Sequence, residues 1–462
     1  MPRRGRAAGD ASRWSLLLPL ALGTVLNPLN SSMISVALVL LALDFDVSTT
    51  HVTLVVSSFY LAAAVGQPLM GGLGDRLGPR RVFIAGMTMV VVSGVVGPFS
   101  QGFGLLLAAR VLQAIGTSTA FPSAVALIRA RSRPEDVQSG MSAIAMANSL
   151  GAALGPIIGG VAVAVGGWQA LFWVNIPLGL AAALAVLFFI APVGRPTRSG
   201  PRPSLLRMLD PLGVLLFACT VLSLLMLMLS IPTGTQWWLV PATAIAAAAF
   251  LWRELRAPSP FLDVRMLTRN RPLMGVYVQF AVFNFAYYGA FYGVPQWLEV
   301  VRGQTPALVG LFMLPLAAIG AIATPLASRL IRRFGTGRML ILGASLLVAG
   351  SAALLLFDDA SPLWVVVAAL AMLGLPYALC NLALQLRMNG SAPKEAAGIA
   401  AGLFQTSRYL GAILSTSMLG LAFAHGIGSA ELHGTAVTMA VLGLGLVGLN
   451  LRRRSDGASS AD

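Results

Sequence analysis

Two arginines lie inside long apolar stretches of this sequence, where a charged side chain has few polar partners. Arg110 is followed three residues later by Gln113, and Arg408 comes three residues after Gln405. A charge at the centre of a bilayer costs about 3 kcal/mol on insertion scales, so it needs a polar partner or a water-filled cavity. We expect these arginines to bind a polar ligand or to couple charge movement.

Each arginine also has an alternative interpretation. Arg110 lies about seven residues from the outer end of its predicted helix, or ~10 Å at 1.5 Å per residue, which is within reach of the interface by snorkelling. Arg408 lies about eleven residues inside its helix, or ~16 Å, and a purely structural role is the alternative there.

A charged loop follows the second apolar stretch and reads Gly71-Gly-Leu-Gly-Asp75-Arg76-Leu-Gly-Pro-Arg80-Arg81. Glycines permit a tight turn and close approach of helices. The Asp75 carboxylate can accept charge-assisted hydrogen bonds from a neighbouring arginine. We interpret the loop as a latch that gates two helix ends. The alternative is a basic loop that serves topology alone.

Small residues recur at helical spacing further along, at Gly151, Gly155, Pro156, Gly159 and Gly160. Small residues four apart let a second helix approach closely. A proline removes one backbone hydrogen bond and bends the helix. The pattern predicts a tightly packed, bent helix, and simple helix packing is sufficient to explain it.

The composition requires lipid as the solvent for most of the chain. Of 462 residues, 57% are hydrophobic and only 10% are charged, whereas soluble domains carry roughly 25% charged residues. A spanning helix needs about 20 predominantly apolar residues. Fourteen stretches meet this requirement: 15–43, 52–72, 82–99, 103–128, 137–165, 168–191, 211–231, 236–252, 272–298, 306–328, 339–356, 362–386, 396–423 and 433–451.

The placement of basic residues predicts the topology. With a cytoplasmic N-terminus, fourteen crossings put 28 of the 31 basic residues in inner segments, as the positive-inside rule requires. We therefore predict a multi-pass protein of a bacterial plasma membrane with both termini cytoplasmic. An aromatic belt at the interfaces is predicted from Trp14, Trp168, Trp237, Trp238, Trp252, Trp297 and Trp364.

Several classes of protein are excluded or disfavoured. The net charge of +15 sits in short clusters at the ends of apolar runs, so no nucleic-acid partner is predicted. The sole lysine, Lys394, follows a proline and cannot complete a phosphate-binding loop, so an ion gradient must supply any energy unless a separate ATPase subunit exists. His51, His425 and His433 form no recognisable set with the acids, and we predict no catalytic residue, metal or cofactor.

Together these motifs resemble the major facilitator superfamily over nearly the whole chain. The loop around Asp75 resembles its signature loop, although Pro79 displaces the basic pair by one residue. The stretch from Arg110 is similar to a second signature, and the segment around Pro156 to the antiporter signature of the drug exporters. The helix containing Arg408, with the extra pair of apolar stretches, resembles the fourteen-helix drug:proton antiporter branch.

This resemblance implies the fold and the domains. It implies an all-α membrane protein with the major facilitator fold, in which two six-helix bundles flank a two-helix insert. We expect the N-terminal bundle at 1–194, and the C-terminal bundle with a short cytoplasmic tail at 266–462. Cytoplasmic linkers with the inserted helices, at about 211–231 and 236–252, fill 195–265. Inverted three-plus-three repeats within such bundles are the usual transporter plan.

The resemblance also exposes a missing acid. Relatives usually carry an aspartate in the first helix, where this chain has Asn30, and an amide cannot carry a proton at biological pH. A cavity with embedded arginines and no carboxylate should not favour lipophilic cations. We therefore expect neutral, zwitterionic or anionic substrates. The candidate proton carriers are Asp44 or Asp46 paired with Arg110, Glu299, and the loop acid Asp75.

The predicted helix at 272–298 is rich in aromatic residues. Phe280, Phe283, Tyr287 and Phe291 share one face at helical spacing. A cavity wall for ring-bearing substrates is one interpretation, and lipid-facing or packing aromatics are the other. The candidate residues of the substrate cavity are Asn27, Asn30, Asn284, Tyr287, Tyr288, Gln296, Gln405 and Arg408.

The sequence thus predicts a secondary active transporter that exports small amphiphilic compounds, by proton antiport and alternating access. We expect it to act as a monomer, with its substrate and membrane lipid as partners. The alternatives are an uptake or metabolite permease of the same superfamily, a membrane enzyme, and a non-transporting sensor on the same scaffold.

Overall fold

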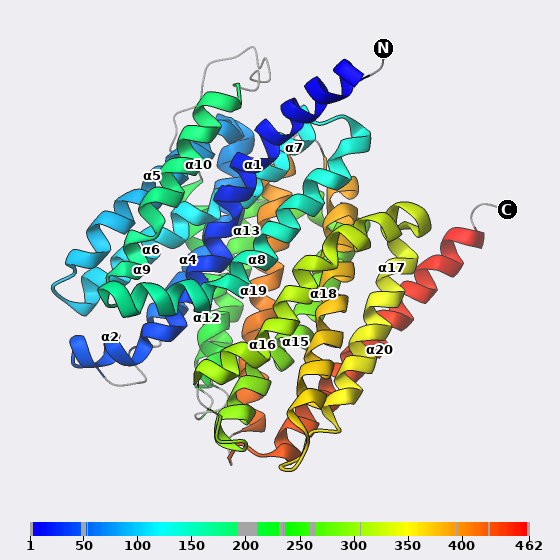
Figure 1. The fold of residues 1–462 in the computed structure, drawn as a ribbon. Helices are drawn as coiled ribbons and strands as arrows, with labels where there is room; N and C mark the ends of the chain where they lie inside the picture. The colour runs from blue at the N-terminus through cyan, green and yellow to red at the C-terminus, as the bar shows by residue number, and fades with distance from the viewer. Residues whose placement is uncertain are drawn as a thin grey trace. The chain divides into compact units, whose positions relative to one another are not determined.

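The computed structural model is built from helices, and the residues it describes contain no strand (Figure 1). Those residues are 3–47, 52, 54–191, 210–230, 234, 236–257, 260, 264–304, 306–393, 396–423 and 426–459. The helices are α1 Arg3–Met33, η1 Ile34–Ala37, α2 Leu38–Asp44, α4 Leu54–Leu77, α5 Pro79–Val96, η2 Gly97–Phe99, α6 Phe103–Ser118, α7 Ala120–Arg131, α8 Pro134–Gly166, α9 Ala170–Trp173, α10 Asn175–Phe189, α12 Pro211–Ser230, α13 Leu239–Arg256, α14 Val264–Arg269, α15 Arg271–Val300, α16 Pro306–Ile322, α17 Thr324–Leu354, α18 Leu363–Ser391, α19 Ala397–Ala422 and α20 Ser429–Ser459.

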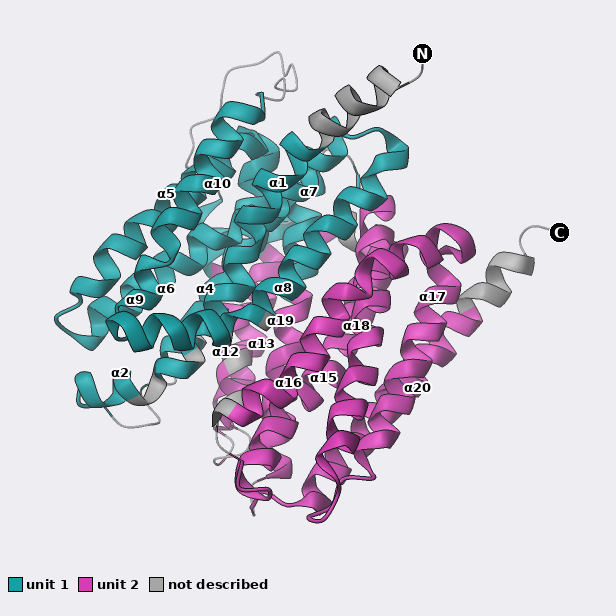
Figure 2. Cartoon of the chain, viewed as in Figure 1, with its two compact units in different colours: residues 1–215, 253–263, 392–406 teal, residues 216–252, 264–391, 407–462 magenta. Residues whose placement is uncertain are grey.

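The chain forms two compact units, which Figure 2 colours separately. The first comprises Met1–Leu215, Arg253–Asp263 and Ala392–Thr406. In it α1 packs along α8 and α10, and α5 packs between α6 and α10. The second comprises Leu216–Trp252, Val264–Ser391 and Ser407–Asp462. There α17 packs against α18 and α20, while α15 contacts the same two helices.

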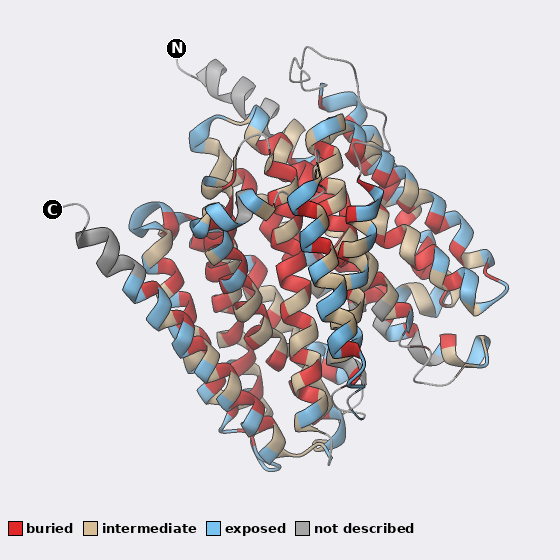
Figure 3. Ribbon diagram, turned by 180° about the vertical axis from the view of Figure 1, so that it is seen from behind, coloured by how far each residue is buried: buried red, intermediate tan, exposed pale blue. Residues whose placement is uncertain are grey.

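The outer faces of many helices carry exposed apolar side chains. Figure 3 shows exposed residues alternating with buried ones along the helices. Val165 is 84% exposed, Phe188 75% and Ile322 75%. Such apolar exposure over many helices suits contact with hydrocarbon, in which helices satisfy their own backbone hydrogen bonds.

The helices of the described residues account for part of the predicted membrane spans. Among the described residues, eight helices are long and apolar enough to cross a membrane, and counting the bent α8 as one span makes nine. Further predicted stretches coincide with α12, α13, α15, α16 and α19. The count of fourteen therefore stays a prediction, as do the domain boundaries that depend on it.

The first predicted span, 15–43, is not one continuous helix. α1 ends at Met33, a 3-10 turn covers Ile34–Ala37, and α2 continues to Asp44. The serine-rich stretch before the break explains part of this. Ser31 and Ser32 both turn their hydroxyls back to the Pro28 carbonyl, and such back-bonding bends helices.

The predicted aromatic belt is partly wrong. Trp14, Trp237 and Trp364 are 62%, 74% and 71% exposed, whereas Trp168 and Trp297 are buried. The two buried indoles each donate to a polar group inside the protein: Trp168 Nε1 to Asp44 Oδ2 at 2.6 Å, and Trp297 Nε1 to Ser429 Oγ at 2.9 Å. A buried indole N–H needs such a partner, which sequence position alone does not reveal.

Candidate functional site

Arg110 lies at the centre of a buried polar cluster in the first unit. Its side chain is 2% exposed, which contradicts the snorkelling alternative. Nη1 donates to Gln113 Oε1 at 2.5 Å, and Nη2 and Nε donate to the carbonyls of Asn30 and Val55, both at 3.4 Å. The guanidinium also lies 4.5 Å from the centre of the Phe59 ring. Gln113 reaches it because residues three apart share a helix face.

Asn30 connects this cluster to α10. Its Nδ2 donates to the Leu26 carbonyl at 2.8 Å and to Asn175 Oδ1 at 2.5 Å. One turn earlier, Asn27 Nδ2 donates to the Thr117 hydroxyl at 3.2 Å. Where relatives have an acid in the first helix, this chain therefore has side-chain amides that form hydrogen bonds with other amides, a hydroxyl and backbone carbonyls.

The proposed pairing of Arg110 with Asp44 or Asp46 is wrong for this conformation. Within the described part of the chain, the acceptors of Arg110 are an amide and two carbonyls. Asp44 is exposed and accepts from Trp168 instead. The charge of Arg110 is thus balanced by dipoles and by an aromatic ring.

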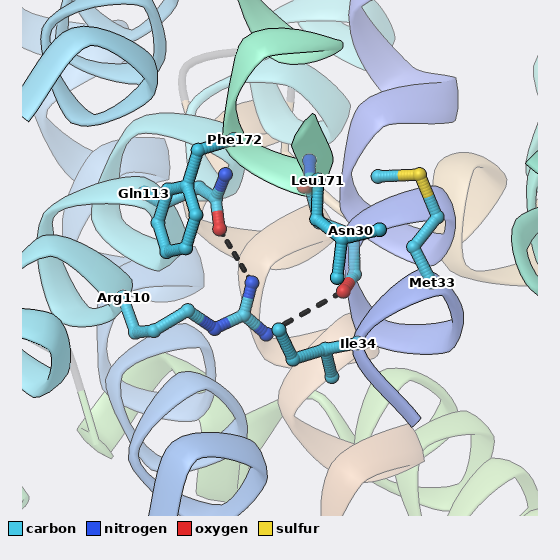
Figure 4. A pocket seen from close by; sticks show the side chains of 7 residues that line it. All are labelled: Asn30, Met33, Ile34, Arg110, Gln113, Leu171 and Phe172. Carbon is cyan, nitrogen blue, oxygen red and sulfur yellow. Dashed lines mark hydrogen bonds between the residues drawn. The ribbon is translucent and has the colours of Figure 1, made fainter. Parts of the chain in front are cut away.

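A small pocket opens beside these residues (Figure 4). Its lining residues are Asn30, Met33, Ile34, Arg110, Gln113, Leu171 and Phe172. The side chains fill it so closely that no room for a water molecule is left, whereas pockets that hold drug-sized ligands measure ~300–1,000 Å³. In this conformation the site is therefore closed to a ligand.

Asp75 caps the start of α19, within the same unit. Its Oδ1 and Oδ2 accept from the backbone N–H groups of Gly398 at 2.8 Å and Ile399 at 3.0 Å. We expected an arginine as the partner. Arg76 and Arg129 act on Asp75 through their charge, whereas its two backbone hydrogen bonds come from a helix N-terminus, whose free N–H groups and dipole favour a carboxylate.

The basic residues of the same loop bind carbonyls. Arg76 Nη2 donates to the Pro260 carbonyl at 3.1 Å, and Arg80 Nη2 donates to the Leu187 carbonyl in the last turn of α10 at 2.8 Å. The helix dipole places partial negative charge at the C-terminus, so a cation is favourable there, just as an anion is favourable at the N-terminus. Arg81 is exposed.

Three of the four motif glycines lie on the seam between α8 and α1. A Cβ at Gly151 would meet the Val25 carbonyl at 2.7 Å, and one at Gly159 the Met33 carbonyl at 2.8 Å. At Gly155 it would overlap the Ser32 hydroxyl. Gly160 faces open space. α8 bends by 47° between Ala152 and Ile157, around Pro156, as the motif predicts.

The aromatic face of α15 is buried in the second unit rather than facing lipid. Phe280 and Phe283 are 0% exposed and Tyr287 is 5% exposed. Tyr287 stacks on Phe283 with ring centres 6.0 Å apart, and its ring lies 4.7 Å from that of Tyr377 on α18. Packing therefore accounts for Phe280 and Phe283, whereas Phe291 is only half-buried.

Arg408 lies near this aromatic cluster, on α19. It is 7% exposed, its Nη2 donates to the Tyr409 hydroxyl at 3.4 Å, and its guanidinium lies 5.1 Å from the Tyr409 ring centre. Tyr288 and Tyr377 also lie close to its guanidinium. Two of the predicted cavity residues, Tyr288 and Arg408, are thus neighbours.

Two of the remaining predicted cavity residues, Asn284 and Gln296, donate to carbonyls of their own helix. Asn284 Nδ2 donates to the Phe280 carbonyl at 2.7 Å, while its buried Oδ1 has no partner among the described residues. Gln296 Nε2 donates to the Tyr292 carbonyl at 2.9 Å. Gln405 is buried in the part of α19 that belongs to the first unit.

Sequence reasoning missed Asn175, Phe59 and Tyr377, each of which touches a candidate residue. Asn175 was detectable as a lone amide in the apolar run 168–191. It also missed that Asp210 is 3% exposed and forms a 2.8 Å ion pair with Arg253. Nothing in the sequence distinguishes Phe59 and Tyr377 from the other aromatic residues of the apolar stretches.

Comparison with known proteins identifies the family. The family model described as Major Facilitator Superfamily matches residues 20–416. The chain belongs to the major facilitator superfamily. The superfamily fold is matched by the proton:xylose symporter XylE bound to 6-bromo-6-deoxy-D-glucose, with a TM-score of 0.68, 16% identity, and coverage of 94% of this chain and 95% of that one.

Sequence relatives lie within the same superfamily. The chain is 38% identical to the uncharacterized MFS-type transporter YwoD of Bacillus subtilis, over 94% of this chain and 95% of the relative. It is 29% identical to the tetracenomycin C resistance and export protein of Streptomyces glaucescens, over 90% of this chain and 77% of the relative. This superfamily member is therefore a multi-pass membrane transporter with relatives named for antibiotic resistance.

Proposed function

We propose that this transporter exports small amphiphilic compounds, by proton antiport and alternating access. The observation that carries the proposal is the glycine seam between α1 and α8, bent around Pro156. That seam is the part of the chain that resembles the antiporter signature of the superfamily's exporters. The relative named as a tetracenomycin C resistance and export protein supports the same direction of transport.

In the proposed mechanism, Asp75 is the latch. Its two hydrogen bonds to the start of α19 hold one state and break in the other. Of the acids considered as proton carriers, Asp44, Asp46 and Glu299 are exposed, whereas Asp75 is half-buried. Asp75 is therefore our candidate for the group whose protonation releases the latch, because a neutral carboxyl loses most of its attraction to a helix N-terminus.

The proposed setting is a bacterial plasma membrane, with both termini in the cytoplasm. The 28 basic residues of the inner segments support this orientation. We propose two six-helix bundles with a two-helix insert, functioning as a monomer in lipid. The proton gradient is the energy source, with no cofactor and no enzymatic reaction.

Everted membrane vesicles test the direction and the energy source. A panel of labelled amphiphiles is offered on the outside of the vesicles, which is the cytoplasmic face. Export predicts accumulation that collapses when a protonophore is added. An uptake permease gives no accumulation in this orientation, and an enzyme converts its substrate without accumulating it; either result contradicts the proposal.

A further inference from the structure

The two embedded arginines differ in how far the protein satisfies them. Arg110 donates to three oxygen atoms and lies against the Phe59 ring. Arg408 has one hydrogen bond within the described part of the chain, a long contact of 3.4 Å to the Tyr409 hydroxyl, and its buried Nε has no partner there. A guanidinium offers five N–H donors, and in Arg408 the buried Nε–H is one that the described residues leave unused.

The charge of Arg408 is uncompensated as well as buried. The side chain is 7% exposed, and the titratable groups near it among the described residues are Tyr288, Tyr377 and Tyr409, which are neutral at pH 7, rather than a carboxylate. A buried charge without a counter-ion is strongly unfavourable. A bound anion would supply the missing charge, and the planar guanidinium suits a carboxylate held by two parallel hydrogen bonds.

The groups around Arg408 also suit a flat ring. Tyr287 and Tyr377 lie with ring centres 4.7 Å apart, and Tyr288 stacks on Tyr292 at 5.3 Å. Tyrosine offers an apolar face for stacking together with a hydroxyl that can donate to an anion. The cluster therefore combines ring surface, tyrosine hydroxyls and a guanidinium whose buried Nε–H has no acceptor among the described residues, all within one unit of the protein.

We propose that Arg408 binds the anionic group of ring-bearing substrates, so that the exported compounds include aromatic carboxylates and phenolates. The proposal rests on the transport function above and names the substrate class. The ring of the substrate lies against the tyrosines of α15 and α18, and its carboxylate accepts from the donors that Arg408 leaves unused.

Three probes with one ring system test the charge preference: 2-naphthoate, neutral 2-naphthamide and cationic 2-naphthylmethylammonium. Binding is measured by calorimetry on the purified full-length protein in detergent. We expect naphthoate to bind at least about tenfold more tightly than naphthamide, because a charge-assisted bidentate contact is worth at least that factor. Arg408→Gln should remove the difference, and Arg408→Lys should retain part of it.

Arg333→Gln is the matched control. Arg333 lies 5.2 Å from the ring of the following residue, Phe334, much as Arg408 lies 5.1 Å from Tyr409, but it is exposed. This variant removes the same charge from the same unit and should preserve the preference for naphthoate. Thermal unfolding separates binding from a structural role: Arg408→Gln should not lower the Tm, since it removes an unpaired buried cation.

The remaining outcomes separate failure of the anion site from failure of the export function. Equal binding of naphthoate and naphthamide, a preference that survives Arg408→Gln, or equally tight binding of inorganic phosphate would contradict an aromatic anion site. In everted vesicles, accumulation of the amide or ammonium probe without naphthoate would leave export standing and refute the anion inference. Binding of naphthoate that depends on Arg408, with no accumulation of any probe, would refute export alone.

Discussion

At the scale of single residues, the two embedded arginines differ in their hydrogen-bond partners. We take this difference to separate a structural arginine, Arg110, from one that can bind a ligand, Arg408. Arg110 is surrounded by acceptors, including Gln113 at 2.5 Å, and its cost of burial is largely met within the protein. Arg408 is not satisfied in this way. Both arginines have the same sequence signal, an arginine three residues from a glutamine in an apolar run, so only the contacts distinguish them.

Asn30→Asp should convert the site beside Arg110 into a proton-binding one. The amide now donates to the Leu26 carbonyl and to Asn175 Oδ1; an ionised carboxylate has no donor for either acceptor, whereas a protonated one has a single O–H. We expect this variant to export a lipophilic dication such as dequalinium about tenfold faster than the unaltered protein, which should export it poorly, because the new acid supplies the negative charge that recognition of a cation requires.

Export is measured by fluorescence in everted vesicles. Gln101→Glu is the control, since it adds the same charge on the exposed surface and should leave dication export unchanged. Robust dication export by the unaltered protein would show that the charge argument is wrong.

At the scale of helices, two devices control how elements approach one another. The start of α19 is bound by the carboxylate of Asp75, a contact that a single protonation or a small shift can break. The seam between α1 and α8 depends instead on the absence of side chains at Gly151, Gly155 and Gly159. The Asp75 contact therefore suits helix ends that separate during transport. The glycine seam suits two helices, α1 and α8, that move together as a rigid pair.

Asp75→Asn should slow transport by about tenfold while leaving the amount of protein in the membrane unchanged. The amide keeps one acceptor oxygen but loses the charge, and hydrogen bonds to charged groups contribute ~1.5–3 kcal/mol. The measurement is initial export rate per molecule of protein. Glu135→Gln serves as the control, because Glu135 is an exposed acid in the first turn of α8. Unchanged rates in Asp75→Asn would refute the latch.

Gly155→Ala should lower stability where Gly160→Ala does not. A methyl group at Gly155 would overlap the Ser32 hydroxyl, whereas Gly160 faces open space. Overpacking of this kind costs ~1–3 kcal/mol, so we expect a Tm lower by several degrees for the first variant in detergent. Equal melting temperatures would mean that the seam is looser than the structure shows.

At the scale of the whole molecule, sorting of arginine to one side of the membrane is the physical basis of the topology. Basic residues are costly to translocate and remain on the cytoplasmic side. With 28 of 31 in alternate segments, an even number of crossings is required. Among the residues it describes, the structure supports eight spans by length and composition, or nine with the bent α8, so the remaining crossings depend on this charge argument.

Both termini should therefore be accessible from the cytoplasm alone. Fusing a reporter that folds only in the cytoplasm to either end should give an active reporter at both ends, while a periplasmic reporter should be inactive at both. Termini on opposite sides would imply an odd number of crossings and would invalidate the fourteen-helix count.

Sequence by itself determined the helical class, the lipid environment and the superfamily, because apolar length, charge placement and short motifs act locally along the chain. It also located Arg110, Gln113, Asp75 and the glycine motif. What only the tertiary structure decided was the set of partners. Asp75 and Gly398 are 323 residues apart, and Asn30 and Asn175 are 145 apart. Such contacts depend on how the helices pack in three dimensions. Periodicity in the sequence shows which residues share a helix face, but it does not show which polar residue of another helix lies opposite them.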